Sequence, residues 1–569
     1  MPSNLPVARS AGARGLFLLT AIGTLAILFG SNFLGTSVHQ YGLSTIYFVL
    51  FTRMDYLGAI CSLLILICAV LVPQRVAFRH VLRWIGERPY IVATSSALVF
   101  GAGALLVYQN HPLAMDEYTQ YFQSQVFASG HLAGLFPAPL LNWLIPEGFQ
   151  NYFLFVSKQT GAVASGYWPA FALLLAPFTF LGIAWAANPL ISAATLIVIH
   201  RLARHMFDDR EAAGLAVLLT IASPVFFANA ISFYSMPAHL LANSLFALLL
   251  VRPTPRRCFA AGLVGSVALT LHNPVPHILF AMPWLLWLGT RPERFRLLGS
   301  TAAGYAPLCL VLGFGWFWFI SELRQTNLGA AAAAGAQLEH VQRLGNAFAF
   351  PDTTIFIARL IGAAKIWLWA VPGLIVIASS GAWVRRDDVF CRLMLYSALC
   401  TFIGFMFVPV DQGHGWGFRY FHTAWVALPL LAAGALARTS SDTQSPRIFA
   451  SDDARAFVVA CALLTLVFGV GFRAWQMYDF IGTNLAQMPA YKGTEQRVII
   501  VDPNFSFYGA DLVQNDPWLR GAVIRMITRG SAEDEAMMRE HFPNLHRVYA
   551  DKFGTVWSAK PTPVAGSTP

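Results

Sequence analysis

Long apolar segments alternate with short polar ones along most of the chain. A helix that crosses the hydrocarbon core of a bilayer, roughly 30 Å thick, needs about 20 mostly apolar residues. Fourteen apolar segments approach this pattern, at 15–35, 56–73, 89–109, 167–187, 189–203, 212–231, 236–251, 258–272, 275–290, 297–320, 354–380, 390–410, 422–437 and 456–476. The pattern predicts a polytopic α-helical membrane protein whose first segment is kept as an anchor.

The polar loops between these segments are of two kinds. Short, arginine-rich loops lie at 75–88, 201–210, 252–257, 291–296, 385–392 and 438–455, whereas loops poor in basic residues for their length lie at 36–55, 110–166, 321–353 and 411–421. Because cytoplasmic loops carry an excess of Lys and Arg, the first kind is predicted inside and the second outside. The alternation gives about 13 crossings, with the N-terminus cytoplasmic and the C-terminus outside. It requires that one of the two apolar segments split at Asn188-Pro189 is short, re-entrant or broken.

Composition supports this interpretation. Hydrophobic residues make up 56% of the 569 residues and charged residues only 12%, about half the usual share, which excludes a disordered chain. The net charge of +10 is largely explained by the arginine-rich loops, so no nucleic-acid partner is predicted. The seven cysteines lie in or beside apolar segments, which predicts no disulfides outside the membrane and no CxxC metal or redox motif.

The last part of the chain has the composition of a soluble domain. RVIIVD at 497–502 is typical of a buried strand, and a helix over 533–540 is predicted to start at Ser531, with Asp534 completing a capping box. Further strands are predicted at 546–550 and 554–557. We therefore expect three parts, namely extra transmembrane helices in 1–88, a main transmembrane domain in 89–480, and a small α/β domain outside the membrane in 481–569.

Two adjacent carboxylates, Asp116 and Glu117, follow a membrane segment by a few residues. Aromatic and apolar residues come after them at helical spacing, which predicts an amphipathic helix along the membrane surface. One interpretation is that the carboxylates complement the helix dipole. The other is a general base at the interface, whose pKa is raised by partial desolvation. The residues themselves leave both open.

Other polar groups are predicted on the same outer side. The loop DQGHGWGFRYFH at 411–422 holds His414 and Arg419; the guanidinium suits a phosphate, although a loop closed by an Arg–Asp pair is the structural alternative. His239 flanks one outside turn, and His272 with Asn273 flanks another. Proline interrupts the spacing from His272 to the next histidine, which does not fit zinc and leaves a polar ligand site or helix capping.

Lys365 lies inside an apolar segment, roughly 16 Å along the helix from its outer end by helix rise. A charge at that depth is costly and indicates a functional site. Its expected partner is a carboxylate or a lipid phosphate. An internal salt bridge to another helix is the structural alternative.

At the Asp-Glu pair, MDEYTQYFQSQVFASG, the chain resembles the C-type membrane glycosyltransferases (GT-C), the superfamily of protein O-mannosyltransferases and lipid A aminoarabinose transferase. SKQTGAVASGYWPAFALLLAPFTFLG, with Lys158, Tyr167 and Pro169, is similar to a Lys/Tyr/Pro stretch of the bacterial members. The run at 200–237 resembles the basic turn, apolar helix and Ser-Pro end of that family, and GHGWGFRYFH resembles its His/Gly/Arg-Tyr element. The resemblance covers 89–440. The chain departs from the family in having two additional helices before the carboxylate loop.

The resemblance implies an inverting transfer of a sugar from a polyprenyl-phosphate-sugar to an envelope glycan, lipid or protein at the outer face of a bacterial inner membrane. Asp116 would be the base, and Glu117 would orient the acceptor or, with Asp116, bind a divalent cation such as Mg²⁺ or Mn²⁺. The implied substrate-binding residues are Lys158, Tyr167, His239, His272, Asn273, Lys365, His414, Arg419 and Tyr420. A lipid or solute transporter is the alternative; it predicts paired repeats, and none is visible.

Overall fold

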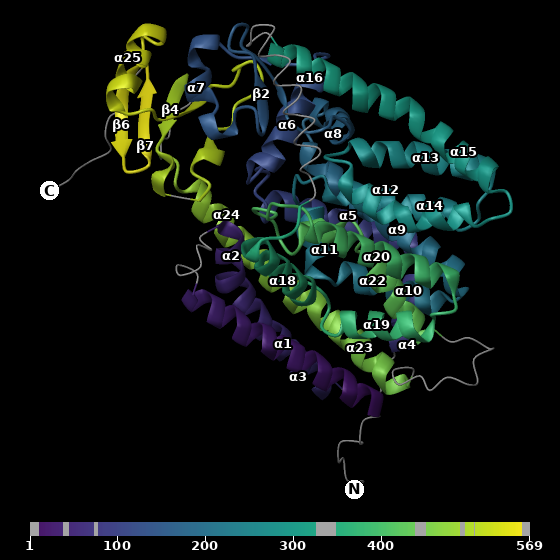
Figure 1. Cartoon of the computed structure of the whole chain (residues 1–569). Coiled ribbons are helices and arrows are strands. Elements are labelled where there is room, and N and C mark those ends of the chain that lie inside the picture. Colours follow the sequence, from purple (N-terminus) through teal and green to yellow (C-terminus); the bar gives the residue numbers. More distant parts are fainter. Residues whose placement is uncertain are drawn as a thin grey trace.

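The computed structural model describes residues 11–37, 45–72, 78–325, 349–437, 451–489, 495–505 and 507–559. Helices pack side by side in one large body, and a small region of strands and one helix lies at its end (Figure 1). The expected polytopic α-helical protein with a small C-terminal α/β region is therefore confirmed.

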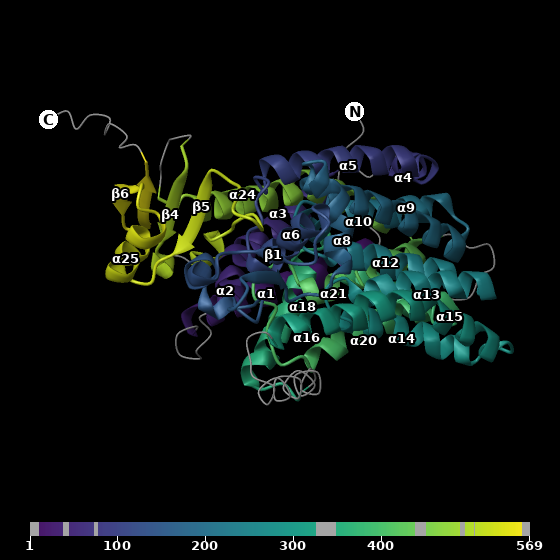
Figure 2. The ribbon, with the colours of Figure 1, turned by 90° about the horizontal axis from the view of Figure 1, so that it is seen from above.

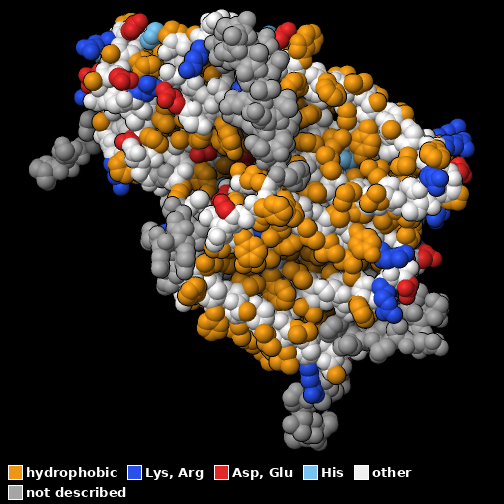
Figure 3. All heavy atoms as spheres, in the orientation of Figure 1, with side chains coloured by type: hydrophobic (Ala, Val, Ile, Leu, Met, Phe, Trp, Pro, Cys, Tyr) orange, Lys and Arg blue, Asp and Glu red, His pale blue; other side chains and the backbone are white. Residues whose placement is uncertain are grey.

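Seven helical segments among the described residues are long and apolar enough to cross a membrane: Ala11–Leu34, Ile46–Leu71, Pro89–Leu106, Ala184–Phe207, Arg294–Arg324, Val389–Met406 and Asp452–Leu485. The shorter apolar helices are α8 (Ala170–Phe180), α12 (Met236–Leu250), α14 (Val275–Gly289), α19 (Leu374–Val384) and α22 (Ala427–Leu436). In Figure 3 the helical part presents a broad apolar surface, with charged side chains gathered toward its ends. Such a surface fits contact with lipid, and the number of crossings stays a prediction.

The N-terminal helices pack against the main body. They are α1 (Ala11–Ser37), α2 (Ile46–Leu50), the π-helical η1 (Phe51–Asp55) and α3 (Tyr56–Leu71). Their neighbours are α18 (Thr353–Leu368), α19 and α23 (Asp452–Leu464) (Figure 1). The amphipathic helix α4 (Phe78–Glu87) then leads through Arg88 into α5 (Pro89–Leu106), whose Pro89 is at a first-turn position that tolerates proline.

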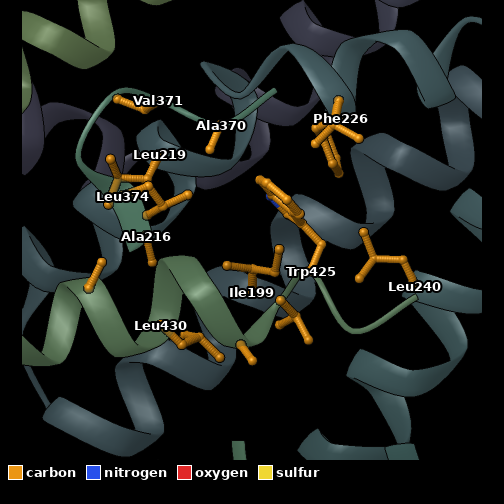
Figure 4. Close-up of a cluster of buried hydrophobic side chains, with 14 of the residues drawn as sticks. Ile199, Ala216, Leu219, Phe226, Leu240, Ala370, Val371, Leu374, Trp425 and Leu430 are labelled. Atoms are coloured by element: carbon orange, nitrogen blue, oxygen red, sulfur yellow. The ribbon is translucent and has the colours of Figure 1, made fainter. Parts of the chain in front are cut away.

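The remaining helices of the main body are α6 (Met115–Ala128), α9 (Ala187–Phe207), α10 (Arg210–Ile221), α11 (Pro224–Ala230), α13 (Pro255–Thr270), α15 (Arg294–Leu308), η5 (Cys309–Gly315), α16 (Trp316–Gln325), α20 (Val389–Met406), α21 (Arg419–His422), η6 (Thr465–Gly469) and α24 (Val470–Leu485). Apolar side chains of α9 to α12, α19 and α22 meet around Trp425 (Figure 4). This ring is only 1% exposed. The cluster holds α11 beside the chain that follows α21. Both segments are next to residues of the candidate site described below.

Two details of the predicted segments are wrong. The break between α8 and α9 lies at 181–183, where Gly182 has a positive φ of 74°, and not at Asn188-Pro189. Pro189 lies in the first turn of α9, where the missing N–H costs no helical hydrogen bond. The segment predicted at 212–231 is also not one straight helix, because α10 and α11 meet at 65°. The expectation of one short segment holds, since α8 has 11 residues and spans about 16 Å.

The C-terminal region has a four-stranded sheet of order β5-β4-β7-β6. Its elements are β4 (Arg497–Val501), β5 (Val523–Ile527), β6 (His546–Asp551), β7 (Gly554–Ser558) and the helix α25 (Ser531–His541). The predicted strands and helix are confirmed, and β5, which pairs in parallel with β4, was missed. The capping box is wrong, because the N-cap position is Gly530 and the Asp534 carboxylate accepts from Thr528 and Trp143.

One face of this sheet packs against the loop at 110–166, which includes α6. Val498 and Ile524 share a core with Tyr118 and Phe122 of α6. A second, small sheet of order β1-β3-β2 lies within the loop itself, with β1 (Gly134–Leu135), β2 (Leu154–Val156) and β3 (Ala162–Ser165). Helix α6 is therefore enclosed by protein on most sides, and does not lie openly along a membrane surface as predicted. Figure 2 shows it between the sheet region and the helical body.

Candidate functional site

Asp116 lies in the first turn of α6 and points toward the loop before α21. Its Oδ2 accepts a hydrogen bond from Arg419 Nη2 at 2.8 Å, and its Oδ1 accepts a short one from the hydroxyl of Tyr167. The side chain is 19% exposed. One carboxylate is thus held by two donors from distant parts of the chain and keeps some access from outside.

These partners determine the ionisation of Asp116. Burial by itself would raise the pKa of Asp116, but the charge of Arg419, the ring of His272 and the Tyr167 hydroxyl together hold the pKa below its usual value. The raised pKa expected from desolvation is therefore wrong in direction. The carboxylate is ionised at neutral pH, which is the form that a general base requires.

Glu117 has a different environment, although it is the next residue. It is fully buried, and it accepts from Tyr108 Oη at 2.9 Å, Phe233 N at 2.8 Å, Leu113 N at 2.9 Å and Ala114 N at 3.4 Å. Burial raises the pKa of Glu117 to about 7, against the effect of these donors. These contacts support the interpretation that Glu117 stabilises the N-terminus of α6.

The two carboxylates therefore do not share one ligand. Successive residues of an α-helix are about 100° apart around its axis, so Asp116 faces Arg419 while Glu117 faces the end of α5 and the chain after α11. Among the residues that the structure describes, no group of three or more His, Cys, Asp or Glu side chains is arranged to hold a metal ion.

Arg419 is held by a loop whose shape depends on glycine. Gly415 has a φ of 148°, and a Cβ there would lie 2.5 Å from the Cγ and Cδ atoms of Arg419. The backbone N of Arg419 donates to Gln412 Oε1 at 2.8 Å, and its guanidinium carbon lies 4.4 Å from the centre of the Tyr234 ring. Despite the cost of burial, Asp116 raises the pKa of Arg419 above its usual value. The Arg–Asp pair thus joins two loops, and Asp411 is not its partner.

Tyr167, His272 and Asn273 complete this side of Asp116. The rings of Tyr167 and His272 stack with their centres 4.1 Å apart, and Asn273 Nδ2 lies 2.7 Å from His272 Nδ1. Since an amide nitrogen only donates, Nδ1 is assigned as the acceptor. Burial lowers the pKa of His272 to about 4, although Asp116 opposes this. The imidazole is neutral at pH 7, so it places a hydrogen-bonding group near Asp116 without adding charge.

Several buried polar atoms around these residues have no hydrogen-bond partner within the described chain. They are both ring nitrogens of His239 and of His414, the hydroxyl of Tyr234, and Nε of Arg419. His239 lies within electrostatic reach of His272, and His414 within reach of Arg419 and Asp116. Leaving such a group unpaired costs about 1–3 kcal/mol, so their convergence indicates a site for a polar ligand. Figure 3 shows the surface hollowed between the sheet region and the helical body, with acidic side chains inside the hollow.

Comparison with known proteins adds the fold. No protein family and no curated protein matches the chain. The crystal structure of ArnT from Cupriavidus metallidurans bound to undecaprenyl phosphate is similar to it with a TM-score of 0.51 and 12% identity, covering 83% of this chain and 98% of ArnT. The chain has the fold of ArnT. The GT-C fold implied by the sequence resemblance is thereby confirmed. The apo structure of the same ArnT has a TM-score of 0.49 and 13% identity, with the same coverage.

Within this GT-C fold, Lys365 has a carboxylate partner. Its Nζ lies 2.5 Å from Oδ2 of Asp55, in the N-terminal η1, and Arg473 of α24 lies 3.0 Å from the other oxygen. Trp369 Nε1 donates to Asp55 as well, at 2.6 Å. The internal salt bridge considered for Lys365 is therefore the contact observed, and no contact in the described structure joins Lys365 to Asp116.

Lys158 and Tyr420 are the remaining candidates. Lys158 is in the exposed turn between β2 and β3, where its charge acts on Glu147. Tyr420 stacks on Phe405 with ring centres 4.4 Å apart and donates its hydroxyl to the carbonyl of Asp411 at 2.9 Å. The contacts of Tyr420 support the loop that carries Arg419.

The sequence missed the residues through which the C-terminal region braces α6. Asp511 Oδ1 accepts from the backbone N of Met115 at 2.7 Å, and Tyr118 donates its hydroxyl to the carbonyl of Asn515 at 2.6 Å. Burial raises the pKa of Asp511 to about 7, and the charge of Asp116 adds to this. Tyr108 was also missed. The sequence shows several polar residues between 511 and 516. Nothing in their spacing predicts contact with α6.

Proposed function

We propose that this protein is a membrane glycosyltransferase that moves a sugar from a polyprenyl-phosphate-linked donor to a hydroxyl group of an envelope acceptor, with Asp116 as the general base. The observation that carries the proposal is the ionised Asp116 carboxylate, held by Arg419 and Tyr167 among unpaired polar groups, in a chain with the GT-C fold. The undecaprenyl phosphate bound to ArnT supports a polyprenyl phosphate as the leaving lipid.

The proposed reaction is a single displacement. Asp116 takes the proton of the acceptor hydroxyl as the acceptor oxygen forms a bond to the anomeric carbon of the sugar. The bond from that carbon to the phosphate oxygen breaks, and the polyprenyl phosphate leaves with the electron pair. One displacement inverts the configuration at the anomeric carbon. The step requires a base beside the acceptor and positive charge beside the developing phosphate.

Arg419 is the group best placed to serve the phosphate. Its Nη2 is occupied by Asp116, whereas its buried Nε has no partner in the described chain. A planar guanidinium can donate to two acceptors in different directions, so one arginine can orient the base and stabilise the leaving group together. The neutral rings of His272 and His414 and the hydroxyl of Tyr234 are available to sugar hydroxyls. Glu117 serves here to fix the start of α6.

The distribution of arginines among the loops supports a proposed cellular side. The arginine-rich loops alternate along the chain with the loops poor in basic residues, and the loop that carries Asp116 is of the second kind. An excess of Lys and Arg is a property of cytoplasmic loops. We therefore place the site and the C-terminal region on the outer face of a bacterial cytoplasmic membrane. The lipid donor reaches it within the membrane, and the acceptor comes from the envelope.

The proposal is tested with purified protein, envelope extract and a panel of labelled polyprenyl-phosphate sugars. Asp116→Asn keeps the shape of the side chain and removes the base, and should lower transfer by about 10²–10⁴-fold. Because it also leaves the buried Arg419 without its carboxylate, transfer is measured well below the Tm of the variant. The matched control is Asp208→Asn, an exposed position with a φ of 47° that asparagine also tolerates, and it should transfer normally. Normal transfer by Asp116→Asn would contradict the assignment of Asp116 as the general base. Movement of the intact labelled lipid across vesicles, with no product formed, would favour the transporter.

A further inference from the structure

A cavity of about 610 Å³ lies where α4, α5, α9 and α10 meet, and Asp116 is not among its lining residues. Its walls include Arg88, Arg204, Arg210, His200, Tyr90 and Glu87. The volume is within the range of about 300–1,000 Å³ that is typical of small-molecule sites. None of these residues has a role in the proposed transfer reaction.

The cavity lies at a membrane boundary. Helix α4 buries Phe78, Leu82 and Ile85 within the protein, where α10 is its neighbour, and exposes arginines on its other side. Directly after it, α5 begins as a membrane span at Pro89, and the far end of α5 leads to the Asp116 loop. In Figure 2, α4 lies at the end of α5 that is remote from α6. The cavity therefore faces the leaflet opposite to the one beside Asp116.

The positive charge in the cavity exceeds the negative charge. Three arginines line it with one carboxylate, Glu87, which lies 3.3 Å from Arg210. Arg204 pairs at 3.1 Å with Asp208, whose side chain is 94% exposed, and such a pair is screened by water. Arg88 forms no ion pair with any described residue and lies over the ring of Trp84. Two net positive charges thus remain at the headgroup level of a membrane.

The backbone at the edge of the cavity is held by tight packing. A Cβ on Gly86 would lie 2.0 Å from the carbonyl oxygen of Arg210, and one on Gly214 would lie 2.0 Å from that of Leu82. His200 Nε2 lies 2.8 Å from the carbonyl oxygen of Gly86. These contacts hold the end of α4 against α9 and α10 and present the arginines together.

Apolar and aromatic side chains continue the site toward the bilayer. Trp84 and Tyr90 are 45% and 59% exposed beside the arginines, at the level where such rings mark the interface. Further along α5, the side chains of Ile91, Leu98 and Val99 are also exposed. A molecule with an anionic head in the cavity would have an apolar surface for its chains along the same helix.

We propose that this cavity binds the phosphodiester headgroup of an anionic phospholipid. The fork of an arginine matches phosphate oxygens, and basic pockets between transmembrane helices are where anionic headgroups bind. A zwitterionic phosphatidylcholine brings its own cation into a cavity that is already positive, and a free phosphate has no chains to lie on α5. Both should bind less tightly than phosphatidylglycerol.

The test measures lipid retained by the purified, intact protein in native mass spectrometry, with phosphatidylglycerol and phosphatidylcholine as probes. Wild type should retain phosphatidylglycerol preferentially, and Arg88→Gln/Arg210→Gln should reduce this retention at least tenfold. Arg256→Gln/Arg291→Gln removes the same charge from two other exposed arginines and should behave as wild type. Equal retention by the two double variants, or equal retention of both lipids by wild type, would overturn the proposal.

Two additions keep the test decisive. Arg88→Gln alone changes an exposed residue and should fold, so its smaller loss of phosphatidylglycerol can be measured if the double variant is unstable. Glycerol phosphate at millimolar concentration should not displace the lipid; displacement would mean that the site recognises a free phosphate, and the lipid as ligand would be wrong.

Discussion

Arg419 Nη2 and Asp116 Oδ2 lie 2.8 Å apart although the two residues are 303 positions apart in the sequence. The pair connects the loop after α20 to the first turn of α6. It holds the Asp116 carboxylate ionised and leaves Nε of the same guanidinium for another acceptor. This contact links the two loops that the proposed chemistry requires, and its removal should change both the base and the phosphate site.

Arg419→Gln should shift the pH profile of transfer. The active base is the ionised carboxylate, so activity is lost as the pH falls through the pKa of Asp116. Arg419 holds that pKa below its usual value, so its removal raises the pKa and moves the acid limb of kcat/KM to higher pH. The measurement is kcat/KM between pH 4 and 9. Arg419→Lys keeps a charge and should shift the limb less. A lowered kcat/KM with an unmoved acid limb would show that Arg419 does not control the ionisation of Asp116.

Glu117→Gln should lower the stability of the fold without removing the proposed base. Glu117 accepts from three backbone N–H groups and from the hydroxyl of Tyr108. An amide replaces one of its acceptor oxygens by a donor, which leaves buried donors unpaired at a cost of about 1–3 kcal/mol each. We expect a lower Tm in thermal unfolding, and a smaller loss for Tyr108→Phe. A wild-type Tm combined with complete loss of transfer would instead assign Glu117 to the chemistry.

The same carboxylate contributes to the pH dependence of stability. Burial raises the pKa of Glu117 from 4.5 to about 7 in the folded protein. A group with a raised folded pKa contributes stability below its unfolded pKa, and this contribution is lost as the pH rises through the folded value. The wild-type Tm should therefore fall between pH 5 and 8, and that of Glu117→Gln should fall less over this window.

Asp55→Asn should weaken the attachment of the N-terminal helices. The substitution removes the carboxylate between Lys365 and Arg473, whose side chains are 1% and 3% exposed. Removing one partner of a buried ion pair costs about 3–5 kcal/mol, because the remaining charge is left uncompensated. We expect a clear fall in Tm, which Asp55→Asn/Lys365→Met should partly reverse.

Lys365→Met alone provides the matching control, since Asp55 keeps Arg473 as its partner. It should lower the Tm less than Asp55→Asn and leave kcat/KM within a few fold of wild type. A hundredfold loss of kcat/KM at an unchanged Tm would indicate that Lys365 binds the donor. A wild-type Tm for Asp55→Asn would show that the contacts of Asp55 with Lys365 and Arg473 do not attach the N-terminal helices.

Most of the architecture was readable from local patterns. Apolar length predicted the helices, because a buried or lipid-facing helix must be apolar along its whole length. The run at 497–501 was recognisable as a strand for the same reason. The errors occurred where local signals are ambiguous. Pro189 is tolerated in a first turn and was mistaken for a break, and the bend between α10 and α11 at Pro224 was missed.

The sequence by itself determined the fold class, the alternation of loops, and a short set of polar residues, because ionisable groups are rare in a chain that lies mostly in lipid. Only the tertiary structure decided how those residues are paired. In the folded chain Asp116 pairs with Arg419, and Glu117 contacts the end of α5. Lys365 pairs with Asp55, which is 310 positions away. Such choices depend on side-chain direction and on contacts between distant segments, and neither is encoded in the local spacing of residues.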